Sequence, residues 1–232
     1  GLPLDPIVFD LDQSGTIDLI SIESSTVHFD FWNDGFLEQT GWVAATDGML
    51  VIDIDQNGFI NGAAELFGSD FALGYLLNAD FSALVNEENG IARLRQYDSN
   101  TDGIINQLDE VWNELKIWQD LNQDGFSQAD ELFTLDTAGI ADIDVSNVKF
   151  EFVGISNGGF TRRNEGHTIT HSSSYTSTEG TTHEIADVWL NNNLVNATSY
   201  THEEGTNLDP RVYFAPNLRG YGLLDDLNVA MS

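Results

Sequence analysis

Cysteine is absent from the 232 residues, which excludes disulfide bridges and thiolate metal sites. Lysine and arginine are scarce, with 8 residues against 38 aspartate and glutamate, and the formal net charge is −30. Because binding to nucleic-acid phosphates needs clustered basic side chains, no nucleic-acid partner is expected. No apolar run approaches the roughly 18 residues that span a bilayer, so no membrane insertion is expected either.

The chain also lacks an initiator methionine and a basic or apolar leader before Gly1, so we expect an excised piece of a longer protein. Its hydrophobic share of 41% and aromatic share of 11% are too high for a disordered chain. A folded chain with this net charge repels itself. It is therefore either adapted to high salt or binds cations as part of its fold.

Four segments repeat one pattern of acidic, amide and glycine residues, D-x-[DN]-x-[DNS]-G. They begin at Asp10, Asp53, Asp98 and Asp120, and we call them the first to fourth loops. The pattern is that of the first half of an EF-hand calcium loop, in which oxygen ligands at positions 1, 3 and 5 converge on one ion. Glycine at position 6 permits the sharp turn, and the backbone carbonyl at position 7 adds a ligand.

Each loop is therefore predicted to bind Ca²⁺, about four ions in all. The candidate ligands are Asp10, Asp12, Ser14, Thr16 and Asp18 in the first loop, Asp53, Asp55, Asn57, Phe59 and Glu65 in the second, Asp98, Asn100, Asp102, Ile104 and Asp109 in the third, and Asp120, Asn122, Asp124, Phe126 and Glu131 in the fourth.

The loops differ in the carboxylate expected to close the site. Glu131 stands at position 12 of the fourth loop as a bidentate ligand, and Asp109 at the same position of the third loop is one methylene shorter. In the second loop the acid is Glu65 at position 13, which predicts an altered geometry. The first loop has no acid at position 12, and Asp18 and Glu23 are both candidates to close it.

Short apolar runs predict strands at residues 7–9 and 49–52, which lead directly into the first and second loops. Residues 62–97 show helical spacing in places. From about residue 142 the sequence changes to β-like runs separated by Ser, Thr, Gly and Asn turns. We therefore expect a β region over 145–205.

Between the third and fourth loops, apolar residues recur at helical spacing from Leu108 to Leu115, and Trp118 extends the stripe. This spacing predicts one helix that links the two loops, as in paired EF-hands. A second, short helix is expected from Asp130 to about Gly139.

The predicted fold class is α+β: short strands and EF-hand-like calcium loops with a central paired EF-hand helical region, followed by a β-rich C-terminal region. Residues 1–141 carry the calcium loops. Residues 142–232 are expected to form the β-rich region packed on them, with a C-terminal tail. The two parts together are expected to make one composite module.

The bond between Asp5 and Pro6 is unusually fragile, and it lies next to the first loop. The aspartate carboxylate can attack its own backbone carbonyl, which closes a five-membered anhydride and expels the proline nitrogen. Proline has no N–H, so the competing succinimide route is closed. A fold that promotes the cut must supply proximity and a general acid. The alternative is an accidental Asp-Pro pair, and Asp209-Pro210, which no such loop follows, is interpreted in that way.

Histidine offers a candidate for that acid, although the sequence does not choose among the five present. His167 and His171 are four residues apart, a spacing that on a helix could hold zinc. Their context reads as a strand, where such residues lie roughly 13 Å apart. No shared zinc site is therefore expected.

The chain resembles the self-processing modules of Frp-type RTX proteins and related large RTX adhesins. The segments that carry the resemblance are Leu4-Asp5-Pro6-Ile7-Val8-Phe9-Asp10, Thr40-Gly41-Trp42-Val43, Glu65-Leu66-Phe67-Gly68, Trp118-Gln119-Asp120 and Thr181-Thr182-His183-Glu184-Ile185-Ala186-Asp187. The resemblance implies that 1–141 is the self-processing region and that calcium triggers a single autocatalytic cut between Asp5 and Pro6. It also implies capture of the anhydride by a lysine of an acceptor protein as an isopeptide, and a secreted or cell-surface location in a Gram-negative bacterium.

A second hypothesis is a non-catalytic, calcium-rigidified adhesin module. The large polar β region over 145–205, which processing chemistry does not obviously need, favours it. Such a module would present a binding face for a cell-surface peptide or glycan. In both hypotheses the chain without calcium is expected to be expanded, because the carboxylates of each loop repel one another.

Overall fold

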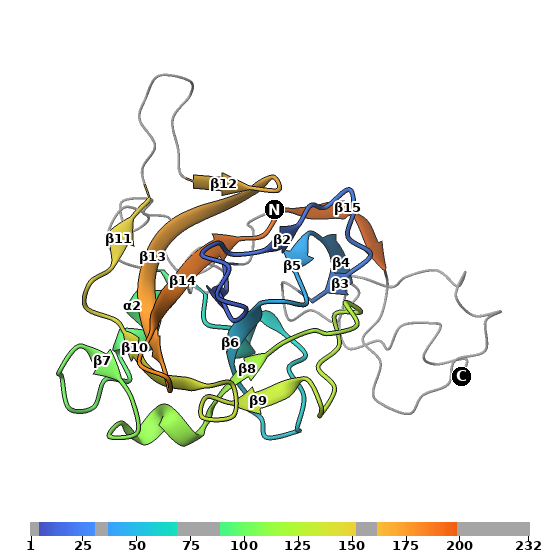
Figure 1. Ribbon diagram of the computed structural model, residues 1–232. Coiled ribbons are helices and arrows are strands. Elements are labelled where there is room, and N and C mark those ends of the chain that lie inside the picture. Colours follow the sequence, from blue (N-terminus) through green and yellow to red (C-terminus); the bar gives the residue numbers. More distant parts are fainter. Residues whose placement is uncertain (1–4, 31–36, 69–88, 152–161, 199–232) are drawn as a thin grey trace, which may run out of the picture.

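The computed structural model describes residues 5–30, 37–68, 89–151 and 162–198, and antiparallel strands dominate them (Figure 1). The first half contains β1 (Ile7–Phe9), β2 (Leu19–Ile20), β3 (His28–Phe29), β4 (Leu37–Thr40), β5 (Trp42–Val43), β6 (Gly48–Ile52), the 3₁₀ turn η1 (Ala63–Glu65), α2 (Gly90–Arg95), β7 (Ile104–Ile105), the 3₁₀ turn η3 (Glu110–Asn113) and β8 (Leu115–Trp118). The remainder contains β9 (Leu132–Thr134), β10 (Ile140–Asp144), β11 (Lys149–Phe150), β12 (Arg162–Asn164), β13 (His167–Ser177), β14 (Thr182–Trp189) and β15 (Asn192–Thr198).

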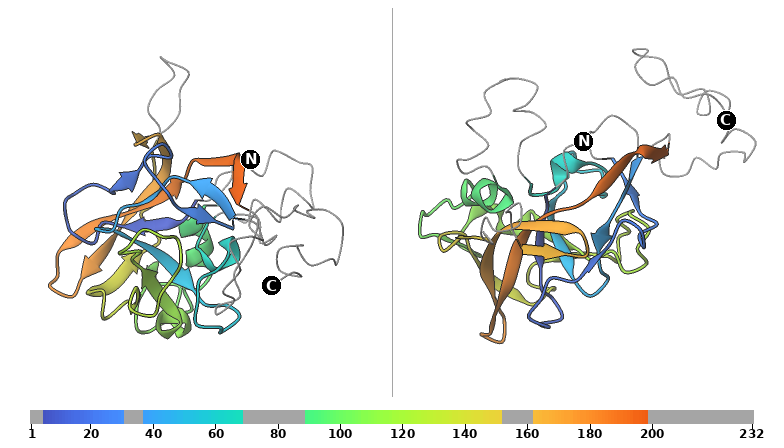
Figure 2. Two further views of the ribbon diagram at one scale, coloured as in Figure 1. Left: turned by 90° about the vertical axis from the view of Figure 1, so that its right-hand side faces the viewer. Right: turned by 90° about the horizontal axis from the view of Figure 1, so that it is seen from above.

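One large antiparallel sheet runs through the molecule in the order β7-β10-β13-β14-β1-β6-β8-β9, with β11 and β12 also paired to β13. The long β13–β14 hairpin curves across the molecule (Figure 1 and Figure 2). Two small sheets, β15-β4-β3 and β2-β5, complete the described part of the chain. The strand β1 is central, because it pairs with β14 on one side and with β6 on the other.

The central strands are apolar at successive positions because both faces of the sheet are buried. In β6, Met49 and Val51 pack into one hydrophobic cluster, whereas Leu50 and Ile52 pack into the other. In β1, Val8 joins the first cluster while its neighbours join the second. The strands predicted at 7–9 and 49–52 are therefore confirmed as β1 and β6.

The predicted paired EF-hand helices are wrong, and with them the α+β class: the described residues are predominantly β, with α2 as their one α-helix. The stretch from 108 to 118 forms only the turn η3 and then strand β8. Leu115 and Ile117 are fully buried, and Lys116 between them is half-buried. That alternation suits a strand between β6 and β9, and the burial gained by pairing outweighs the local helical spacing.

The other predicted helices have a similar outcome. Residues 130–139 form β9 between two turns rather than a helix. Of the stretch 62–97, η1 and α2 are short helical segments, and residues 69–88 lie outside the described part. None of the helices in the described residues is long and apolar enough to cross a membrane.

Candidate metal loops around a buried Asp-Pro bond

The four loops share one backbone conformation. At position 4 a residue other than glycine has a positive φ in every loop, which is uncommon and marks a specific turn. The φ values are 61° at Gln13, 58° at Gln56, 58° at Thr101 and 59° at Gln123. The glycines at position 6 follow with 86° at Gly15, 89° at Gly58, 85° at Gly103 and 77° at Gly125. Only glycine takes such values at little cost, which accounts for its repeated place in the pattern.

The carboxylate at position 1 organises each loop by accepting hydrogen bonds from two backbone N–H groups. In the fourth loop, Asp120 accepts from Asp124 N at 3.2 Å and from Gly125 N at 2.9 Å. The same pair of bonds, from positions 5 and 6, is made to Asp10, Asp53 and Asp98. The oxygen at position 3 also accepts from the N–H at position 5 in every loop, at Asp12, Asp55, Asn100 and Asn122.

In three of the loops a further, local carboxylate joins the two ends of the loop. In each case it accepts hydrogen bonds from the backbone N–H groups of positions 2 and 9. Glu131 accepts from Leu121 N at 2.9 Å and from Gln128 N at 3.4 Å. Asp109 accepts from the corresponding residues at 2.9 and 3.0 Å. Glu65 does the same at 3.2 and 2.9 Å, so its place at position 13 leaves the closing geometry intact.

Asp47 takes this closing role in the first loop. It accepts from Leu11 N at 3.0 Å and from Asp18 N at 2.7 Å, again positions 2 and 9. Carboxylate oxygens of Asp10, Asp12 and Asp47 all lie within 4.8 Å of one another. Sequence reasoning missed this residue because it is 29 positions from Asp18 and outside the repeated pattern. Its place just before β6, the partner strand of β1, is the signal that could have found it.

The two residues predicted to close the first loop lie elsewhere. The Asp18 side chain accepts hydrogen bonds from the hydroxyls of Thr16 and Thr46, at 3.3 and 3.2 Å. Glu23 is exposed. The closing carboxylate of the first loop therefore comes from a distant segment, whereas the other three are local.

Burial of these carboxylates makes their charge costly. Burial is the main cause that raises the pKa of Asp47 to about 7; the backbone hydrogen bonds from Asp18 and Leu11 oppose this rise, and the neighbouring charges of Asp10 and Asp18 add to it. Burial also raises the pKa values of Glu65, Asp120 and Glu131 above their usual range. For Asp109 burial acts in the same direction, but hydrogen bonds from Asn106 and Ser99 outweigh it and the pKa is lowered. A cation between the carboxylates of a loop would offset the cost of their burial.

The donor sets fit a calcium ion. Asp53, Asp55 and Glu65 offer three carboxylate oxygens within 4.8 Å of one another, as Asp10, Asp12 and Asp47 do. No histidine belongs to either group in the part of the chain that the structure describes. Sites built only from oxygen suit hard cations such as Ca²⁺, whereas zinc prefers imidazole or thiolate ligands.

Loops 2 and 4 lie side by side, which differs from the predicted pairing of loops 3 and 4. The Ser127 hydroxyl accepts from Ile60 N at 2.6 Å and lies 3.3 Å from the Ile60 carbonyl oxygen. Both residues are at position 8 and buried. The third loop instead contributes β7, which pairs with β10. Ser127 thus interrupts the apolar pattern at position 8 because its hydroxyl joins two loops.

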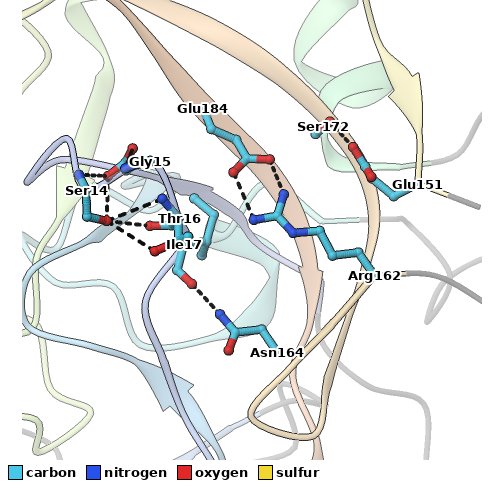
Figure 3. Close-up of polar contacts among 10 residues, drawn as sticks. Ser14, Gly15, Thr16, Ile17, Glu151, Arg162, Asn164, Ser172 and Glu184 are labelled. Carbon is cyan, nitrogen blue, oxygen red and sulfur yellow. Dashed lines mark hydrogen bonds and ion pairs between the residues drawn. The ribbon is translucent and has the colours of Figure 1, made fainter. Parts of the chain in front are cut away.

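The first loop is held against the β12–β13–β14 surface (Figure 3). The Asn164 side chain donates to the Ile17 carbonyl, and the Arg162 guanidinium pairs with the Glu184 carboxylate. Asp10 N donates to the Glu184 carbonyl at 3.1 Å. These contacts connect the start of the loop, at the end of β1, to the large hairpin.

The Asp5–Pro6 bond is buried at the other end of β1, and Asp5 is only 3% exposed. On one side Val188 N donates to the Pro6 carbonyl at 3.0 Å, and on the other Ile7 N donates to the Phe67 carbonyl at 3.0 Å. A Cβ atom added at Gly68 would lie 2.7 Å from Asp5 Oδ1 and 3.1 Å from the Asp5 carbonyl oxygen. The bond is therefore confined from two sides. Asp209–Pro210 lies outside the described residues.

The two histidines singled out in the sequence lie on β13. His167 is fully buried, with Nε2 2.8 Å from the Ile20 carbonyl oxygen and Nδ1 accepting from Asn191 N at 3.0 Å. Burial lowers the pKa of both His167 and His171. Because both ring nitrogens of His167 are already used, it has no proton to give to another group.

Replacing Asp47 by Asn is expected to weaken calcium binding at the first loop by about tenfold to a hundredfold. The change removes a charge and a hydrogen-bond acceptor worth about 1.5–3 kcal/mol in such a setting. Isothermal titration calorimetry with CaCl₂ measures it. Asp18→Asn is the matched control and should have the smaller effect. A larger loss in the Asp18 variant, or unchanged titrations in the Asp47 variant, would contradict the assignment.

Comparison with known proteins gives two findings. The family model described as SPM domain matches residues 7–191. The chain is also 38% identical, over 229 residues, to the iron-regulated protein FrpA of Neisseria meningitidis serogroup C. The aligned part covers 97% of this chain but only 18% of that relative, so the relative is a much longer protein.

Proposed function

The chain belongs to the SPM domain family, and on that premise we propose that it is a calcium-triggered module that cuts its own Asp5–Pro6 bond. The observation that carries the proposal is the place of this bond: it is buried between β14 and the segment 66–68. β1 leads from Pro6 into the first candidate calcium loop, and the segment 66–68 directly follows the second. The relation to FrpA supports an RTX-type parent protein. The reaction is a single turnover on the chain itself.

Two of the loops are directly connected to the segments that hold the Asp5–Pro6 bond. β1 connects Pro6 directly to Asp10, the first candidate ligand of the first loop. In the second loop the closing carboxylate, Glu65, is followed by the segment 66–68, which covers Asp5. Ordering either loop would therefore reduce the freedom of the scissile bond. Calcium, when bound, supplies the positive charge that holds the carboxylates of each loop together.

Asp5 supplies the nucleophile of the reaction. One oxygen of its carboxylate attacks its own backbone carbonyl carbon and closes a five-membered anhydride, while the bond to the Pro6 nitrogen breaks. Val188 and Phe67 hold the backbone on the Pro6 side through hydrogen bonds, and Gly68 leaves just enough room for the Asp5 carboxylate. Holding the reacting atoms in this way replaces a rare encounter by a fixed contact.

The anhydride is opened by water or by an amine. A lysine of an acceptor protein would form an isopeptide bond with the freed aspartyl group. Lys149 is exposed on β11 and Lys116 is half-buried on β8, and neither is singled out by its contacts as an internal acceptor. We propose a secreted or cell-surface setting, where calcium is near millimolar and sites of about 10⁻⁴ M affinity are filled.

The test uses the full chain with a bulky tag fused before Gly1. The protein is purified in EDTA, CaCl₂ is added to about 2 mM, well above the affinity expected of extracellular sites, and the intact mass is followed. We expect the tag to leave together with residues 1–5, so that Pro6 becomes the new N-terminus. An unchanged mass in a chain that folds with calcium would overturn the proposal and leave a structural calcium module.

A further inference from the structure

A fully buried carboxyl lies close to the scissile bond and belongs to none of the four loops. Asp187 is 0% exposed. It lies on β14 and pairs with Ile7 of β1. A buried carboxyl is expensive to keep charged, so one that stands beside a reacting bond is a candidate for proton transfer.

The ladder between β1 and β14 places Asp187 near Asp5. It continues as far as the scissile bond, since Val188 N donates to the Pro6 carbonyl. Alternate residues of an extended chain project to the same face, so Asp5, two residues before the start of β1, lies on the same face as Ile7. Asp187, directly opposite Ile7, projects to that face as well. Asp5 and Asp187 are then diagonal neighbours, and such positions are about 7–8 Å apart.

The segment that covers Asp5, at Phe67 and Gly68, contacts the segment that covers Asp187, at Gly90. A Cβ atom added at Gly68 would lie 2.7 Å from Asp5 Oδ1, and one added at Gly90 would lie 2.3 Å from the Phe67 carbonyl oxygen. The Gly90 N–H donates to Asp187 Oδ2 at 2.6 Å. Backbone packed too tightly for side chains therefore closes over both groups, and both are shielded from water.

The protonation of Asp187 suits a general acid. Burial raises its pKa to about 7, although hydrogen bonds from Gly90, Thr170 and Trp189 favour the ionised form. An acid whose pKa lies near the working pH is protonated often enough and still releases its proton readily. Among the groups that face it, Asp5 lies on the same face of the sheet, and His171 on β13 is its partner in the ladder.

We propose that Asp187 donates the proton that the Pro6 nitrogen needs in order to leave, an inference that rests on the proposed function. As an Asp5 carboxylate oxygen bonds to the Asp5 carbonyl carbon, the bond from that carbon to the Pro6 nitrogen breaks. Its electron pair takes the proton of Asp187. The products are the anhydride at Asp5, a secondary amine at Pro6 and a carboxylate at Asp187.

The carboxylate can regain its proton through β13. The Thr170 hydroxyl oxygen is 2.9 Å from Asp187 Oδ1 and 3.1 Å from His171 Nδ1. His171 is half-buried and so is closer to solvent than Asp187. This hydrogen-bonded path also gives the experiment a second position to change.

The test measures the rate of Asp5–Pro6 cleavage at saturating calcium, at pH values from about 6 to about 9, which bracket the working range of a general acid near neutrality. In the unchanged protein the rate should fall as the pH rises through the Asp187 pKa. Asp187→Asn should lower the rate at neutral pH by about a hundredfold or more and abolish that dependence. Thr170→Val removes a donor to the ionised form, so it should move the fall in rate to higher pH. Asp142→Asn, at a half-buried position of β10, is the control and should change neither the rate nor its pH dependence.

Two results would overturn the role of Asp187: cleavage in Asp187→Asn at the unchanged rate with the unchanged pH profile, or a flat profile in the unchanged protein. The second result needs no variant, so the test holds even if Asp187→Asn does not fold, which circular dichroism with calcium reveals. If the unchanged protein does not cut at all, the proposed function fails. If the unchanged protein cuts itself but Asp187→Asn changes neither the rate nor its pH dependence, only this inference fails.

Discussion

Asp5→Asn is expected to abolish calcium-dependent cleavage, with a fall in rate of at least about 10⁴-fold. An amide side chain is a much weaker nucleophile than a carboxylate, and it cannot close the anhydride. Asn is nearly the same size as Asp, so it should fit beneath Gly68 without displacing β1. The measurement is the intact mass of the tagged chain after calcium addition, compared with the unchanged protein over the same time.

Two controls separate a chemical effect from a structural one. The variant must fold with calcium as the unchanged chain does, with a matching far-UV circular dichroism spectrum and melting temperature. Asp5→Glu keeps the charge but would need a larger ring, so it should also cut poorly. Release of a chain that begins at Pro6 from folded Asp5→Asn would exclude the anhydride mechanism.

Removal of calcium is expected to unfold or greatly expand the chain. At calcium about tenfold above the dissociation constant, each site contributes about 1.4 kcal/mol, so four sites contribute about 5–6 kcal/mol. That sum is comparable with the whole stability of an ordinary domain, about 5–15 kcal/mol. A formal net charge of −30 without bound cations adds self-repulsion. Cleavage should therefore cease in EDTA and return when calcium is added in excess.

Far-UV circular dichroism and hydrogen exchange, each with calcium and with EDTA, measure this coupling. Magnesium at the same concentration is the control, because its smaller octahedral shell fits such loops poorly. Protection of the amides in β1 and β6 should be lost without calcium and restored by it. Identical spectra and protection in the two conditions would show that the fold does not depend on the ion, and the trigger would then have to lie elsewhere.

Local sequence patterns predicted the elements whose cause is local. The repeated spacing from Asp10, Asp53, Asp98 and Asp120 led to four loops that share one set of backbone bonds. A turn of this kind depends on residues only a few positions apart, so its glycine and its carboxylates can be read directly. The same holds for β1 and β6, whose unbroken apolar runs reflect burial on both faces.

The stretch from Leu108 to Trp118 shows where this reading fails. Its apolar residues fit both a helix and a strand, and nothing local decides between them. The partner does: β8 has β6 on one side and β9 on the other, and pairing buries Leu115 and Ile117 completely. The wrong helix then led to the wrong pairing of loops, because Ser127 contacts Ile60 of the second loop instead.

By itself, the sequence determined the acidic character, the four loops, the central apolar strands and the presence of a fragile Asp-Pro bond beside the first loop. Only the tertiary structure decided that Asp47 closes that loop and that Asp187 stands on the same face as Asp5. Each of these residues reaches its place through strand pairing across a long stretch of chain. Such pairing depends on which surfaces bury each other best, and no short window of sequence contains that comparison.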